Sequence, residues 1–142
     1  MNVIEKLVNA LFELPELGVV TDRLKQRRTP IAVGGLTGVN KAHLIAALRN
    51  MTGRPVLILC ADEAEALRLS ADVRCLSGEE LLGFPAREFN FYNVESVSRA
   101  WEHRRMQALW RLAKGRAPIV AASVDAAMQR TLDRQALLGT AF

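Results

Sequence analysis

The run Val56-Leu57-Ile58-Leu59-Cys60, directly after Pro55, is apolar at every position. A second run of this kind, Ile119-Val120-Ala121-Ala122, follows Pro118. Strands that are apolar throughout are typical of a parallel sheet that is buried on both faces. Because the intervening sequence has helical periodicity, we predict an α/β fold with three layers, a parallel sheet flanked by helices.

Further elements follow on either side of these two strands. Glu80-Leu81-Leu82-Gly83-Phe84 gives a weaker strand signal, and Ile31-Ala32-Val33 predicts a short strand that ends at Gly34-Gly35. Apolar spacing predicts helices over 2–14, 15–28, 40–51, 62–74 and 95–114, and one or two helical turns over 123–130. We therefore expect a sheet of about four strands.

The domain organisation follows from these elements. We predict N-terminal helices over 1–29, one α/β domain over 30–132, and the start of a following segment over 133–142. The pattern stops at Phe142 without a final strand, so we expect the chain to be a fragment of a larger protein.

Composition excludes several classes of protein. Of the 142 residues, 50% are hydrophobic, which is too many for a disordered chain. No apolar run approaches the ~20 residues that cross a bilayer, and the N-terminus lacks the pattern of a secretory signal. Two cysteines, Cys60 and Cys75, make neither a disulfide framework nor a zinc motif. We expect a cytoplasmic protein that does not bind membranes.

The net charge of +4 is unevenly distributed. Residues 61–90 carry seven acidic side chains and three basic ones, whereas residues 91–116 carry two acidic and six basic ones. A local excess of this size is more typical of a solvated helix face than of a nucleic-acid footprint.

One segment could carry chemistry, because it lies between a predicted strand and a predicted helix, as a phosphate-binding P-loop does. The pattern GxxxxGK[ST] aligns with residues 35–42, in which Gly35 and Lys41 are in place. Asn40 replaces the second glycine, and Ala42 replaces the hydroxyl residue that would hold Mg²⁺. The candidate phosphate-loop residues are Gly35, Thr37, Gly38, Asn40, Lys41 and Ala42, and we predict that this loop is inactive.

Three interpretations of this loop stay open at this point: a turn that never held a nucleotide, a P-loop that has lost its function, and a working P-loop. No apolar run ends in Asp-Glu to supply a second metal ligand. His43 and His103 are 60 positions apart and have no acid or cysteine at ligand spacing. We therefore predict no catalytic residues and no metal site.

Four stretches in this order resemble the N-terminal UvrB-like domain of bacterial transcription-repair coupling factors (the Mfd family). The loop at 35–41 looks like the TGSGK loop of UvrB after loss of its working residues. The stretch PVLILCADEAEA (55–66) is similar to the family's second strand and the following helix. FPAREFNFY (84–92) resembles the family's FP-x-W/R-E-x-x-P-Y, with Phe91 in place of the proline, and 105–130 resembles the segment that ends in AL-x-QR.

The resemblance covers roughly residues 10–132 and implies a P-loop NTPase-like fold with a degenerate nucleotide site. It implies a DNA-repair protein that displaces stalled RNA polymerase and recruits the UvrA excision machinery. In that family this module is not catalytic and serves interaction and autoinhibition. ATP and Mg²⁺ would then serve a motor elsewhere in the parent protein. The partners would be other domains of that protein, with UvrA, RNA polymerase and DNA reached through it.

Two other functions are compatible with the same residues. One is a small ATP-binding P-loop enzyme or switch, which Ala42 disfavours. The other is a DNA-binding module that uses the cations Arg104, Arg105, Arg111, Lys114 and Arg116.

The predicted helix over 95–114 has an apolar arc wider than one contact with a sheet requires. We expect part of this arc and the aromatic loop before it to face a neighbouring domain. The interface candidates are Phe89, Phe91, Tyr92, Trp101, Arg105 and Trp110. Because Arg105 falls within the arc, its guanidinium must either pair with a carboxylate or reach the rim of the domain.

Overall fold

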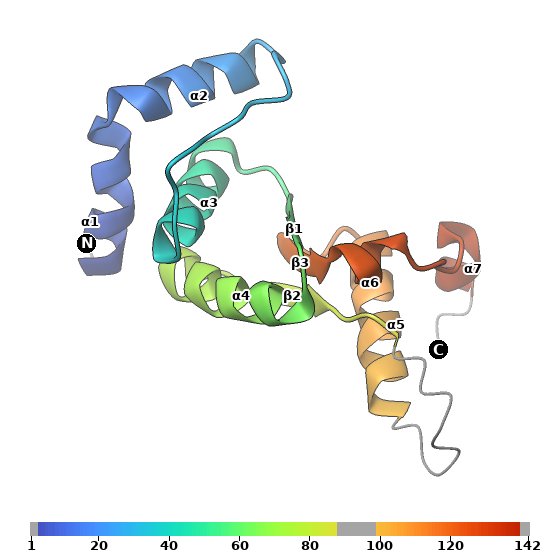
Figure 1. Cartoon of the computed structure of the whole chain (residues 1–142). Helices are drawn as coiled ribbons and strands as arrows, with labels where there is room; N and C mark the ends of the chain where they lie inside the picture. Colours follow the sequence, from blue (N-terminus) through green and yellow to red (C-terminus); the bar gives the residue numbers. More distant parts are fainter. Residues whose placement is uncertain (1–2, 88–98, 140–142) are drawn as a thin grey trace. The chain divides into compact units, whose positions relative to one another are not determined.

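The structure, a computed structural model, describes residues 3–87 and 99–139. In chain order its elements are α1 (Val3–Ala10), the 3-10 helix η1 (Leu11–Glu13), α2 (Pro15–Lys25), α3 (Val39–Thr52), β1 (Val56–Cys60), α4 (Glu63–Ser77), β2 (Leu81–Phe84), α5 (Arg99–Ala113), β3 (Ile119–Ser123), α6 (Val124–Met128) and α7 (Arg134–Gly139) (Figure 1). No helix among the described residues is long and apolar enough to cross a bilayer.

The chain forms two compact units. Unit 1 contains Met1–Arg54 and Ala71–Gly78, and unit 2 contains Pro55–Ser70 and Glu79–Phe142. The candidate phosphate loop belongs to unit 1, and the whole sheet belongs to unit 2. The predicted boundaries at 29 and 132 stay a prediction.

Unit 1 is a cluster of helices around small and aliphatic side chains. Val8 of α1 and Leu17 of α2 are buried with Ala46 and Ala47 of α3. Alanines on α3 allow its neighbours to approach closely, and the partly buried side chains around them complete the core. These are Ile4, Leu11, Leu44, Leu48 and Leu76.

Unit 2 contains a three-stranded parallel sheet in the order β1-β3-β2. The central strand, β3, is buried along its whole length, as expected of a strand with a neighbour on each side. Its Val120 and Ala122 pack with Phe84 of β2, Ala108 of α5 and Ala126 of α6. The predicted parallel sheet flanked by helices is therefore confirmed at this level.

The predicted strand over 31–33 is wrong, because these residues lie in neither a helix nor a strand. Pro30 lacks an N–H to donate to a ladder, and Gly34-Gly35 ends the apolar run after three residues. Among the described residues the sheet accordingly has three strands.

The prediction that 55–60 is buried on both faces is correct for one face only. Ile58 and Cys60 are buried, whereas Leu57 is 63% exposed and Leu59 is 55% exposed. The register places Leu57 beside Val120 and Leu59 beside Ala122, both of which are buried. β1 is an edge strand, and the core that covers this face is built on β2 and β3.

Candidate functional site

The candidate phosphate loop turns into α3 through two glycines. Gly35 has a φ of 78° and Gly38, the N-cap of α3, has a φ of 48° with a ψ of −126°. Residues with a Cβ rarely adopt either backbone conformation, so both positions require glycine. The loop therefore turns into α3 through two glycines but lacks the strand that precedes a P-loop.

The amides that follow this turn are bonded within the loop. The Asn40 amide donates to the Thr37 carbonyl at 3.0 Å, and the Lys41 amide donates to the Gly38 carbonyl at 3.2 Å. In a phosphate-binding loop such amides point at the anion. Here they close the first turn of the helix.

Ala42 occupies the position at which a P-loop carries its Mg²⁺-binding hydroxyl, and its side chain is fully buried. The next residue, His43, bonds through Nε2 to the Leu7 carbonyl of α1 at 2.7 Å. Since a carbonyl can only accept, Nε2 is the protonated nitrogen. Ala42 and His43 therefore both make contacts within unit 1.

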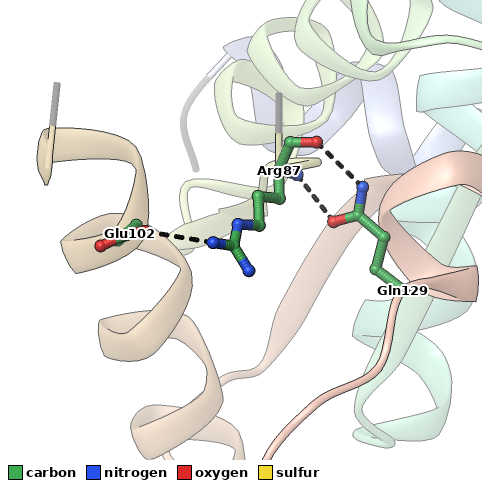
Figure 2. A network of polar contacts seen from close by, with 3 residues as sticks. All are labelled: Arg87, Glu102 and Gln129. Atoms are coloured by element: carbon green, nitrogen blue, oxygen red, sulfur yellow. Dashed lines mark hydrogen bonds and ion pairs between the residues drawn. The ribbon is translucent and has the colours of Figure 1, made fainter. Parts of the chain in front are cut away.

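A second polar cluster lies in unit 2, where the chain leaves the carboxyl ends of β2 and β3. Gln129, after α6, pairs with the backbone of Arg87: its Oε1 accepts from the Arg87 amide at 2.7 Å, and its Nε2 donates to the Arg87 carbonyl at 3.1 Å. The Arg87 side chain reaches Glu102 of α5 at 3.8 Å (Figure 2). This ion pair is exposed, so it contributes little to stability.

Arg105 joins the same elements from α5. Its Nη1 donates to the Pro85 carbonyl at 2.8 Å, and its Nη2 donates to the carbonyls of Ala126 at 3.1 Å and Gln129 at 3.3 Å. The guanidinium lies over the Phe84 ring, 4.0 Å from the centroid. Burial lowers the pKa of the Arg105 guanidinium from its usual value, because desolvation disfavours the charged form.

Among the described residues no carboxylate pairs with the Arg105 guanidinium, which instead lies at the carboxyl edge of the sheet. The side chain is half-buried, and it donates to three backbone carbonyls and lies over an aromatic ring. A planar guanidinium with five donors can bind several carbonyls at once, which a lysine cannot do.

The structure brings two of the four resemblance stretches together. Arg105, the first residue of the stretch 105–130, bonds to Pro85 in FPAREFNFY and to Gln129 near the end of its own stretch. Sequence reasoning gave no role to Gln129 or Glu102. A polar side chain directly after a short helix, as at Gln129, was the available signal, but no pattern identified its partner.

Two further interface candidates, Trp101 and Trp110, lie on α5. Trp101 is 38% exposed, and Trp110 is half-buried with Lys114 Nζ 5.6 Å from its ring centroid. Phe89, Phe91 and Tyr92 lie outside the described residues. Among the residues that are described, no group of His, Cys, Asp and Glu side chains could hold a metal ion.

No family model, curated protein or solved structure matches the chain significantly.

Gly38→Ala tests the geometry of the loop. We expect it to lower the free energy of unfolding by about 1–3 kcal/mol, because a Cβ is strained at this φ and ψ. The matched control is Gly18→Ala inside α2, where alanine should stabilise by about 0.5–1 kcal/mol. Urea unfolding followed by circular dichroism measures both. Equal effects of the two substitutions would contradict the described turn.

Arg105→Met tests the carbonyl-binding role of the guanidinium, since it keeps the apolar stem and removes the donors. We expect a loss of about 2–3 kcal/mol in the stability of unit 2. The neighbouring Arg104 is exposed, so Arg104→Met should change stability by less than about 0.5 kcal/mol. Both tryptophans lie on α5, so their fluorescence reports on this unit during urea unfolding. A tolerated Arg105→Met would show that the carbonyls do not need it.

Proposed function

We propose that the chain is a non-catalytic, P-loop NTPase-like module of a bacterial transcription-repair coupling factor. The order of the four resemblance stretches supports this proposal, as does the parallel sheet flanked by helices. The cluster around Arg105 adds support, because it gives two of those stretches one shared structural purpose.

The fully buried methyl group of Ala42 is the single observation that carries the non-catalytic part of the proposal. A working loop needs a hydroxyl here that faces the metal. The amides of Asn40 and Lys41, already bonded to loop carbonyls, support the same conclusion. This loop has a glycine turn but neither a hydroxyl that faces a metal nor amides that point at a phosphate. We expect such a loop to remain when a P-loop has lost its ability to bind a nucleotide.

In the proposed parent protein the module serves interaction and autoinhibition. It forms part of the region that recruits UvrA and restrains a DNA-translocating motor until RNA polymerase is engaged. ATP and Mg²⁺ act on that motor and not on this module. The exposed Leu57 and Leu59 on β1 would suit contact with another domain of the parent, since exposed apolar patches mark interaction surfaces.

A DNA-binding role receives less support from the cations proposed for it. Arg105 is bonded to backbone carbonyls, and Arg111 is paired with Glu80. Two of the five cations are therefore engaged inside unit 2.

A titration with Mg-ATP tests the proposal. We expect no saturable binding at micromolar concentrations and no hydrolysis above the blank, and we expect Lys41→Ala to remain folded with unchanged ATP behaviour. In a working P-loop this lysine is a central phosphate contact. The double variant Asn40→Gly with Ala42→Ser restores the consensus and serves as the comparison.

Micromolar binding by the natural chain that Lys41→Ala abolishes would contradict the proposal. It would favour the alternative, a small ATP-binding enzyme or switch.

A further inference from the structure

An open hollow of about 120 Å³ lies in unit 2 and shares Phe84 and Pro85 with the Arg105 cluster. It is formed by the first turns of α4, the ends of β2 and β3, and the start of α5. Its lining is mostly apolar and includes Ala66, Leu67, Phe84, Pro85 and Trp101. Crevices at the carboxyl ends of parallel strands are where open α/β sheets bind ligands.

Gly83 and Ala121 line the hollow, and they are register partners on β2 and β3. A Cβ built on Gly83 would meet no atom within 4 Å. Gly83 is also absent from the glycines with positive φ, so its backbone does not require glycine. A glycine inside a strand often marks a place that a ligand approaches closely, and here its missing side chain keeps the hollow open.

Two opposite charges border the hollow. Glu63 comes from the first turn of α4, and Arg104 comes from α5. Neither forms an ion pair with any residue that the structure describes, and the Arg104 guanidinium lies 5.4 Å from the centroid of the Trp101 ring. An apolar hollow with one free carboxylate and one free guanidinium is complementary to a ligand that carries both charges.

The volume limits the size of the ligand. A cavity of about 150 Å³ holds one benzene ring, whereas sites for drug-sized molecules start near 300 Å³. The hollow is therefore too small to enclose a nucleotide, and its volume suits one apolar side chain.

We propose that this hollow binds a free α-amino acid with a large apolar side chain, of the size of phenylalanine or leucine. The side chain lies over Gly83 and Ala121, the carboxylate binds the Arg104 guanidinium, and the ammonium binds Glu63. This binding is independent of the proposed role in DNA repair, and the nucleotide titration does not bear on it.

The test is an NMR titration of the full chain, labelled with ¹⁵N, with L-phenylalanine. We expect saturable shifts of the Gly83 and Ala121 amides and of the Trp101 indole. Phenylacetate lacks the ammonium and phenethylamine lacks the carboxylate, so each should bind at least about tenfold more weakly. Glu63→Gln should remove the advantage of phenylalanine over phenylacetate, and Arg104→Gln should remove its advantage over phenethylamine.

Gly83→Val fills the hollow and should abolish binding of all three compounds; Gly83→Ala is the milder variant if valine prevents folding. Gly18→Ala, in unit 1, should leave binding unchanged. No saturable shift with any compound, or binding that survives in a folded Gly83 variant, would overturn the proposal. Equal binding of phenylalanine and phenylacetate with no effect of Glu63→Gln would also overturn it, and would indicate a pocket for an apolar side chain of a protein partner.

Discussion

The hydrogen bonds of the Arg105 guanidinium hold together the segments that leave the sheet of unit 2. Its hydrogen bonds reach Pro85, directly after β2, and Ala126 and Gln129, which follow β3. Because these strands are parallel, the segments that leave them start at the same edge of the sheet, and their carbonyls need donors there. One planar side chain on α5 satisfies three of those carbonyls and lies over the ring of Phe84.

Through this arrangement, side chains from outside the strands hold the segments at the carboxyl edge of the sheet. Gln129 extends the effect by pairing with both backbone groups of Arg87, much as a neighbouring strand would. Protein groups therefore bind the backbone carbonyls at this edge, while Gly83 and Ala121 line a hollow beside it. In the candidate phosphate loop, likewise, backbone amides bond within the protein and close a helix turn.

Much of the fold could be predicted from the sequence, and the failures have physical causes. The apolar runs at 56–60 and 119–122 identified two parallel strands, since runs that are apolar throughout are typical of strands in a parallel sheet. The run at 31–33 has the same character but is too short and too closely flanked by Pro30 and Gly34 to form a ladder. Exposure of Leu57 and Leu59 depends on strand order, which periodicity does not encode.

The candidate sites, too, could be predicted where the signal is local in sequence and not where it depends on the fold. Asn40 and Ala42 could be recognised as departures because a P-loop is a local motif, whereas the partners of Arg105 are 20 to 24 positions away along the chain. Hydropathy placed Arg105 in an apolar arc, but only the three-dimensional arrangement reveals that backbone carbonyls receive its donors.

The most direct test of the central claim is the NMR signal of the arginine side chains at neutral pH. A guanidinium held by three carbonyls rotates slowly, so Arg105 should give separate Nη–H resonances, while exposed Arg104 should give one averaged signal. The Arg105 resonances should not change when Mg-ATP is added. An averaged Arg105 signal like that of Arg104 would contradict the claim that this side chain organises the edge of the sheet.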